Sequence, residues 1–194
     1  MESKEVRIEL LIIACSAGGM MLLMDLLSSL KEDVGFAVLV IVHRNEKYAS
    51  SLEQMAQHKC VLRVKSAEEK ETLQAGTVYF APAGYHLLIE KDRSISLDAS
   101  EPVHYCRPSI DVSMQSAAEV YKKSLVAILL SGANKDGAEG LRAVYKYGGK
   151  TLVQDPSAAL VDVMPRAAIE TGAVTAVLLD EQLKAYCKSL VEEN

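Results

Sequence analysis

The chain has 194 residues, 49% hydrophobic side chains and a formal net charge of −5 at pH 7. This length is enough to bury roughly 70% of the unfolded surface, so we expect one domain over residues 1–194 with its core at about 8–179. The dispersed basic residues and the 5% aromatic content argue against nucleic-acid binding, and the apolar runs are far shorter than the roughly 20 residues that a membrane insertion requires.

Apolar, β-prone runs recur along the chain, and most of them are separated by helical stretches. The predicted strands are Ile8 to Ala14, Phe36 to Val42, Val61 to Val64, Val78 to Ala81, Ser124 to Leu130, Lys150 to Val153 and Val174 to Leu178. These runs are almost continuously apolar instead of alternating, as strands buried on both faces are. The pattern predicts an α/β fold with a doubly wound, mainly parallel sheet that is flanked by helices.

Helices are expected between these strands and at the end of the chain. The predicted helices are Met20 to Leu30, Ser51 to Gln57, Ser109 to Tyr121, Gly137 to Tyr147, Ala167 to Thr171 and Glu181 to Glu192. One region differs from this alternation, because the polar turn Lys91-Asp92-Arg93 joins two short apolar runs. The region at about 86–97 is therefore predicted to be an appended β-hairpin.

The cysteines give little sign of an oxidising environment. All four are scattered without a CxxC pair, and no leader-like segment precedes the first predicted strand, so we expect a reduced, cytoplasmic protein. Cys15 directly precedes Ser16, but successive side chains of a strand point in opposite directions. Cys15 is therefore expected to be a small buried residue.

Polar side chains stand at the carboxyl ends of three predicted strands. Ser16 follows the first, His43 follows the second, and Asp136 lies in the loop after the fifth. In an open parallel sheet these strand ends collect ligands and reacting groups. If the three strands are neighbours, the residues would meet as nucleophile, general base and orienting carboxylate of a serine hydrolase.

The glycine-containing turn at Ser16 has other interpretations. A phosphate-binding loop is one, although the turn lacks both G-x-G-x-x-G and a G-K-[ST] ending. The G-x-S-x-G elbow of α/β-hydrolases is another, but Ala14 stands where its first glycine would be. Both alternatives are disfavoured, while spacing alone does not establish the triad.

Short motifs occur in one order from about Ile8 to Leu179. They are Ala14-Cys15-Ser16-Ala17-Gly18-Gly19, Val42-His43, Gly76 to Pro82 with His86, Arg107-Pro108-Ser109-Ile110-Asp111, Leu130-Ser131-Gly132 through Asp136-Gly137, Gly148-Gly149 with Gln154-Asp155, and Met164-Pro165. Together they resemble the catalytic domain of the bacterial chemotaxis protein-glutamate methylesterase family. The resemblance covers nearly the whole chain.

The resemblance implies a doubly wound α/β hydrolase that removes methyl esters from glutamyl side chains on the cytoplasmic helical region of methyl-accepting chemoreceptors. Some members also deamidate glutamines there, and the family needs no cofactor and no metal. By motif position, Ser16 would be the nucleophile, His43 the base and Asp136 its orienting partner. The backbone amides of Ala17 and Ala133 would hold the oxyanion.

Further residues are assigned to substrate binding. Gly18 and Gly19 shape the turn beside the nucleophile, and Met20 would contact a receptor helix if it is exposed. Arg107 would hold an acidic neighbour of the substrate glutamate, with an ordinary ion pair as the alternative. His86 matches a family position, where a structural hydrogen bond near the cleft is expected.

The chain departs from the family pattern at several positions. Ala17 replaces the usual threonine, Ala133 replaces a methionine, and Lys135 adds a cation beside Asp136, where an outward-facing lysine is expected. The family's amino-terminal receiver domain has no room before the first predicted strand. We therefore expect a stand-alone enzyme, a shortened protein or a detached domain, with a separate receiver or a receptor methyltransferase among its partners.

These departures keep two alternatives to the receptor esterase open. The first is a catalytically weakened adaptor of the same fold that binds receptors. The second is a stand-alone esterase of small molecules. Catalysis on receptors is favoured, because Ser16, His43 and Asp136 are all present.

Overall fold

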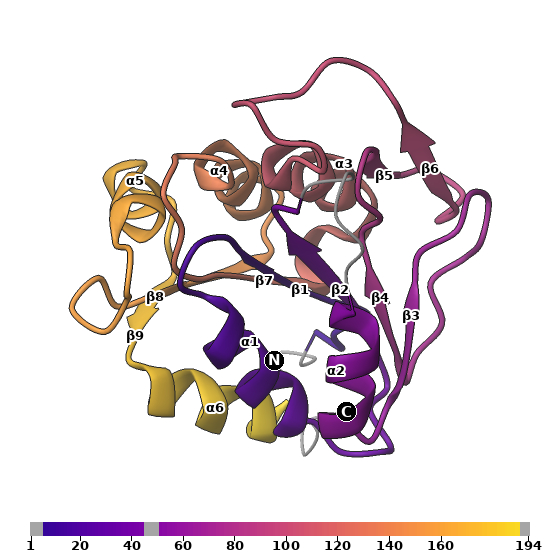
Figure 1. Ribbon diagram of the computed structural model, residues 1–194, viewed down its shortest axis with the longest axis horizontal. Coiled ribbons are helices and arrows are strands. Elements are labelled where there is room, and N and C mark those ends of the chain that lie inside the picture. Colours follow the sequence, from indigo (N-terminus) through magenta and orange to yellow (C-terminus); the bar gives the residue numbers. More distant parts are fainter. Residues whose placement is uncertain (1–5, 45–50, 191–194) are drawn as a thin grey trace, which may run out of the picture.

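The computed structural model describes residues 6–44 and 51–190, and at its centre lies a seven-stranded sheet. The strands lie in the order β3-β4-β2-β1-β7-β8-β9, and every neighbouring pair is parallel (Figure 1). Their bounds are β1 Leu10–Cys15, β2 Ala37–Val42, β3 Arg63–Ser66, β4 Thr77–Phe80, β7 Leu125–Leu129, β8 Lys150–Gln154 and β9 Ala176–Leu178. The predicted doubly wound α/β fold is confirmed.

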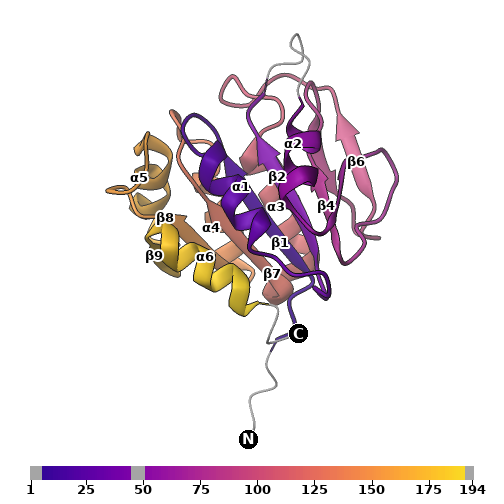
Figure 2. The same ribbon diagram turned by 60° about the horizontal axis from the view of Figure 1, so that its bottom comes forward.

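Helices cover both faces of the sheet, as Figures 1 and 2 show. One layer holds α1 (Met20–Ser28), α2 (Leu52–Lys59) and α6 (Asp180–Ser189), and the other holds α3 (Ile110–Tyr121), α4 (Ala138–Lys146) and α5 (Val163–Glu170). A short 3₁₀ turn, Lys122–Ser124, joins α3 to β7. Within the described part of the chain, no helix has the length and apolar character that crossing a bilayer requires.

The central strand β1 supplies both cores. Leu11 and Ile13 pack with α1 and α6, whereas Leu10 and Ile12 pack with α3 and α4 on the other face. All four side chains are 0% exposed. Burial on both faces explains why the strand is continuously apolar.

The predicted hairpin is also confirmed. Strands β5 (His86–Ile89) and β6 (Ile95–Asp98) pair in antiparallel fashion outside the main sheet. Two serines of α3 attach it, since Ser113 Oγ donates to Leu87 O at 2.7 Å and Ser116 Oγ accepts from Ile89 N at 3.0 Å. The hairpin thus extends the helical layer that contains α3.

The predicted bounds differ most at the two last helices. Helix α5 begins at Val163, four residues before the expected Ala167. Pro165 lies in its first turn, where a missing N–H costs no hydrogen bond. Helix α6 ends at Ser189, and the last residues expected in it, 191–192, lie outside the described residues.

Candidate active site

The carboxyl ends of β2, β1 and β7 lie side by side, which meets the condition for Ser16, His43 and Asp136 to approach one another. His43 N donates to Cys15 O at 3.4 Å, and Ser16 N donates to Ser131 O at 2.9 Å. These backbone bonds continue the pairing of the three strands beyond their last residues. The residues after each strand are therefore fixed relative to one another.

The turn that carries Ser16 is tightly packed. Gly18 has a φ of +81°, and a Cβ added there would lie 2.8 Å from Ser131 Oγ and from Leu160 Cβ. A Cβ on Gly19 would lie 2.6 Å from Cys15 Cβ. Glycine is required at Gly18 because both the positive φ and the lack of space exclude a side chain, and at Gly19 because the lack of space alone excludes one.

Ser131 fastens this turn to a second loop. Its buried hydroxyl donates to Ala17 O at 2.8 Å and lies 3.0 Å from Val161 O. The same oxygen accepts a hydrogen bond from Val161 N at 2.9 Å. Ser131 thus connects the Ser16 turn to the loop that precedes α5, a role that the sequence analysis did not identify.

His43 and Asp136 form a direct pair. His43 Nε2 lies 2.8 Å from Asp136 Oδ2, and their side chains are 10% and 0% exposed. The carboxylate also accepts hydrogen bonds from Ser109 Oγ at 2.9 Å, Ile110 N at 2.7 Å and Asp111 N at 2.9 Å. Because these amides open α3, the positive end of the helix stabilises the buried carboxylate.

These contacts shift both pKa values. Burial alone would raise the pKa of Asp136, but the hydrogen bonds from His43 and from the Asp111 and Ile110 amides outweigh it and hold that pKa below its ordinary value. Burial lowers the pKa of His43, yet hydrogen bonds and charge interactions with Asp136 and Cys106 dominate and raise that pKa to about 9. Asp136 is therefore an anion near neutral pH, and His43 is readily protonated.

The other ring nitrogen of His43 faces a cysteine. Cys106 Sγ lies 3.4 Å from His43 Nδ1, and Asn134 Nδ2 donates to the same sulfur at 3.2 Å. Cys106 was not among the predicted site residues, although it directly precedes the Arg107-Pro108 motif. His43, Cys106 and Asp136 each offer a ligand atom within 4.8 Å of the others, so they could hold a metal ion.

The Ser16 hydroxyl is not joined to this pair in the structure. It makes no hydrogen bond to any residue of 6–44 or 51–190, although Ser16 itself is partly exposed at the end of β1. The backbone amides of Ala17 and Ala133 likewise donate to no acceptor in these ranges. The structure thus shows a His-Asp pair, a nearby serine and two amides that are available to a ligand.

Asp111 has a structural role that the sequence analysis left undefined. Its Oδ1 accepts hydrogen bonds from Gly137 N at 2.8 Å and Gly140 N at 2.7 Å, which caps α4. Asp136, which lies just before α4, in turn accepts hydrogen bonds from the first amides of α3. An acid in α3 therefore caps α4, and an acid next to α4 caps α3. Burial and the neighbouring charge of Asp136 raise the pKa of Asp111 to about 6, although the two glycine amides oppose the shift.

Two other predictions concern structural residues. His86 is buried, its Nδ1 accepts from Ser109 N at 3.1 Å, and its Nε2 lies 3.1 Å from Glu101 O, which confirms the expected structural hydrogen bond. Cys15 is 0% exposed, and burial raises the pKa of its thiol to about 12. A buried, protonated thiol is a poor nucleophile, so Cys15 belongs to the core.

The residues assigned to substrate binding lie in the same region but have different surroundings. Met20 is partly exposed at the start of α1. Lys135, which was not assigned to substrate binding and was expected to face outward, is exposed in the loop before Asp136. Arg107 Nη1 donates to Ala99 O at 2.7 Å and to Ser100 O at 2.9 Å. The Arg107 guanidinium thus supports the loop that follows β6, and its contact with a substrate stays a prediction.

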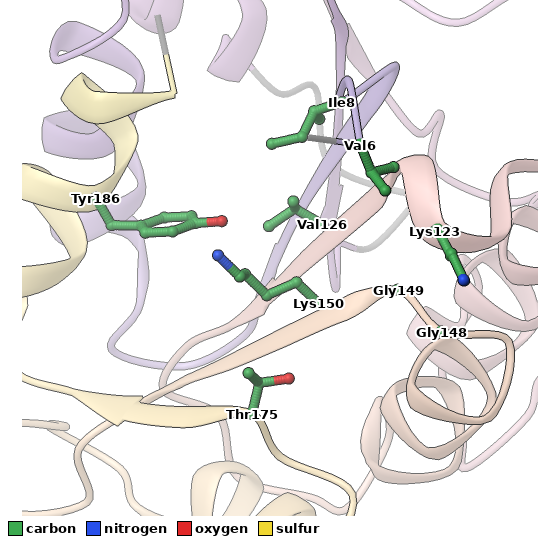
Figure 3. Close-up of a pocket in the computed structure, with 9 residues that line it drawn as sticks. All are labelled: Val6, Ile8, Lys123, Val126, Gly148, Gly149, Lys150, Thr175 and Tyr186. Atoms are coloured by element: carbon green, nitrogen blue, oxygen red, sulfur yellow. The ribbon is translucent and has the colours of Figure 1, made fainter. Parts of the chain in front are cut away.

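A cavity of about 410 Å³ lies elsewhere, at the amino ends of β7 and β8 (Figure 3). Lys150 Nζ lies 4.9 Å from the centre of the Tyr186 ring on one side of it. Ser16, His43 and Asp136 do not line this cavity. In parallel sheets reacting groups collect at the carboxyl ends of the strands, so this cavity is not the candidate active site.

The chain is similar to known proteins in sequence and in fold. A family model described as CheB methylesterase matches residues 11–186. A relative from Leptospira interrogans, provisionally named protein-glutamate methylesterase/protein-glutamine glutaminase, is 40% identical over 186 residues, which are 96% of this chain and 96% of that protein. The crystal structure of the Thermotoga maritima CheB methylesterase catalytic domain matches with a TM-score of 0.89 at 30% identity, covering 96% of this chain and 100% of that one.

Some relatives are longer than this chain. A Symbiobacterium thermophilum protein, named protein-glutamate methylesterase/protein-glutamine glutaminase, is 37% identical over 169 residues. The match covers 87% of this chain but 47% of that protein, so the chain spans about half its length.

Proposed function

The chain belongs to the CheB methylesterase family, and on that premise we propose that it hydrolyses methyl esters of glutamyl side chains on chemoreceptors. Ser16, His43 and Asp136 carry the reaction, and the same residues deamidate glutamines at such sites. The observation that carries the proposal is the 2.8 Å pair of His43 and Asp136 beside the strand end that bears Ser16. A hydroxyl needs such an oriented base to act as a nucleophile at neutral pH.

The hydrogen bond to Asp136 defines which ring atom of His43 is the base. Because Nε2 carries the proton that faces the carboxylate, the lone pair lies on Nδ1. Cys106 Sγ contacts this atom at 3.4 Å. The Ser16 hydroxyl must therefore share or replace the Cys106 contact when substrate binds.

The reaction then follows acyl transfer in two steps. Ser16 Oγ attacks the ester carbonyl while His43 Nδ1 takes the hydroxyl proton, and the imidazolium returns it to the departing methoxide, so methanol leaves. Water attacks the resulting glutamyl-serine ester, His43 again accepts the proton, and a free glutamate side chain is released. With a glutamine substrate the leaving molecule is ammonia.

The two available amides support oxyanion binding. Ala17 N follows the nucleophile, and Ala133 N lies in the loop after β7, and neither donates to a residue in the described ranges. Loss of one such donor typically lowers turnover roughly 10²–10³-fold. Backbone donors persist whatever the side chain, so alanine at both positions is compatible with catalysis.

The wider setting is part of the same proposal. The substrate lies on the cytoplasmic helical region of a chemoreceptor, Gly18, Gly19, Met20 and Arg107 contact it, and residues 1–194 act as one cytoplasmic domain. A separate receiver protein regulates it, and a receptor methyltransferase produces its substrate. The names of the relatives give no support to the adaptor or the small-molecule esterase.

Methanol release from a methylated receptor fragment tests the proposal. Wild-type protein is expected to release methanol, and Ser16→Ala is expected to lose at least roughly 10³-fold in turnover with unchanged thermal stability. Ser28→Ala, which removes an exposed hydroxyl on α1, is the matched control and should retain full activity. Wild-type release by Ser16→Ala would refute the assignment.

A further inference from the structure

We propose that His43 and Cys106 form a binding site for a thiophilic divalent cation of the Zn²⁺ class, and that the bound ion switches the active site off. The site uses the face of His43 that points away from Asp136. It requires no residue outside the described ranges.

The spacing of the two ligand atoms fits such an ion. His43 Nδ1 and Cys106 Sγ lie 3.4 Å apart. With Zn–N near 2.0–2.1 Å and Zn–S near 2.3 Å, tetrahedral coordination places the two ligands about 3.5 Å apart. An ion can therefore bridge the imidazole and the sulfur with little movement of either side chain.

Asp136 completes the site without binding the ion. Its carboxylate already holds His43 Nε2 and three further donors from the start of α3. Histidines that ligate metals usually donate their second ring N–H to a carboxylate, which orients the ring and increases its basicity. The Asp136–His43 pair has this arrangement, with Nδ1 directed to Cys106.

The ligand types select the metal. Imidazole and thiolate favour Zn²⁺ and similar borderline or soft ions, whereas Mg²⁺ and Ca²⁺ prefer oxygen. Cys106 is the one partly exposed cysteine in the chain, since Cys15, Cys60 and Cys187 are all buried. Binding displaces to solvent the thiol proton of Cys106 and, where His43 is protonated, the proton on its Nδ1, and water fills the remaining coordination positions.

The consequence for catalysis rests on the proposed function. A metal on Nδ1 occupies the lone pair that accepts the Ser16 proton, so esterase activity stops until the ion leaves. Two protein ligands with open positions make an exchangeable site instead of a permanent structural one. The ion is therefore an inhibitor and not a cofactor.

Cobalt spectroscopy tests binding without any esterase assay. Co²⁺ added to wild-type protein is expected to produce the near-ultraviolet thiolate-to-cobalt absorption that a Cys–Co bond gives. Cys106→Ser should lose this band, while Cys60→Ser and the inactive Ser16→Ala should retain it. Asp136→Asn should need roughly 10–100-fold more Co²⁺, and circular dichroism shows whether each variant is folded.

A missing band in folded wild-type protein, or a band that persists in Cys106→Ser, overturns the site. Zn²⁺ inhibition of methanol release gives the functional result, measured for each protein relative to its own metal-free activity. Cys106→Ser should require at least tenfold more Zn²⁺ for half inhibition, and a chelator should restore wild-type activity. Equal Zn²⁺ inhibition of wild type and Cys106→Ser would overturn the proposal that the bound ion inhibits the enzyme. A wild-type protein that has no esterase activity but shows the cobalt band would overturn the proposed function without affecting the metal site.

Discussion

Under the proposed function, the charge state of His43 sets the pH range in which the pair of His43 and Asp136 can support catalysis. Hydrogen bonds and charges from Asp136 and Cys106 outweigh the effect of burial and raise the pKa of His43 from 6.5 to about 9. In the proposed reaction, only the neutral imidazole can accept a proton from Ser16. The base is therefore scarce at neutral pH and becomes available as the pH rises towards the raised pKa.

We expect kcat/KM to rise about tenfold per pH unit below a midpoint near pH 9 and to level above it, with the midpoint set by the pKa of His43. A pH series of esterase rates measures this, with exposed His58→Gln as the control that leaves the profile unchanged. Cys106→Ser should move the midpoint to lower pH, because it removes one cause of the raised pKa. A wild-type midpoint near the ordinary value of 6.5 would contradict this account.

Single residues were predicted from the sequence where a strand ended in a polar side chain. Ser16, His43 and Asp136 each follow an apolar run, so parallel pairing alone was enough to place them at one edge. Cys106 and Asp111 carry no such signal, because neither follows a strand. Their contacts depend on how the loop before α3 folds back over β2 and β7, which local sequence does not specify.

At the scale of elements, Asp111 caps the start of α4 and Asp136 caps the start of α3. Asp111 of α3 accepts from the Gly137 and Gly140 amides at the start of α4, while Asp136 accepts from the amides of α3. Unpaired buried amides are costly. These two caps therefore fix the relative position of α3 and α4 and, with it, the carboxylate that orients His43.

Asp111→Ala is expected to destabilise the protein by about 1–3 kcal/mol, because it leaves the two glycine amides buried without an acceptor. Urea unfolding measures this free energy. Glu119→Ala, an exposed position on the same helix, should change it by less than about 0.5 kcal/mol. Equal stability of the two variants would show that the cap does not hold α4.

The turn after β1 offers a second matched pair of variants. Gly18 and Gly76 have similar φ values of +81° and +74°, but an added Cβ meets Ser131 and Leu160 at Gly18 and open space at Gly76. Both alanine variants should lose about 1 kcal/mol to backbone strain. Gly18→Ala should lose more, and its turnover should fall because Ser16 is displaced, whereas normal turnover in Gly18→Ala would contradict the tight turn.

Element bounds were predicted well where the hydrophobic pattern stopped sharply and less well at α5. The hairpin β5-β6 and the strands of the sheet occur where expected. Helix α5 begins at Val163, before the predicted Ala167, and tolerates Pro165 because a proline within the first helical turn removes no hydrogen bond.

At the scale of the whole molecule, the active-site edge also carries exposed apolar side chains. Leu160 is 81% exposed and lies against Gly18, and Met21 is 82% exposed in the first turn of α1. Under the proposed function, we expect a helical receptor segment that brings its glutamate to Ser16 to pass over this surface. These side chains would pack against the apolar flank of that helix.

Leu160→Ser is expected to raise KM for a methylated receptor fragment about tenfold with little change in kcat, because it removes apolar contact area outside the reacting groups. Steady-state kinetics separate the two constants. Val61→Ser is the control, since Val61 is 56% exposed but precedes β3 at the opposite edge of the sheet. Unchanged KM in Leu160→Ser would place the receptor elsewhere.

The overall topology could be predicted only in part. Apolar runs predict a parallel sheet, but the order β3-β4-β2-β1-β7-β8-β9 depends on which distant strands pair. The candidate site depends on β2, β1 and β7 being neighbours, and the sequence pattern left this adjacency as an assumption. The resemblance of the motifs to a known family implied a doubly wound sheet. In the structure β1 pairs with both β2 and β7, so the three strands are neighbours.

The most direct test of the account is covalent labelling with a fluorophosphonate, which reacts with serines that a neighbouring base activates. Peptide mapping should place the label on Ser16 of the wild-type protein, with no label in Ser16→Ala and much slower labelling in His43→Ala. A label on Cys106, or equal labelling of wild type and His43→Ala, would contradict the claim that Ser16 is activated by His43 and Asp136.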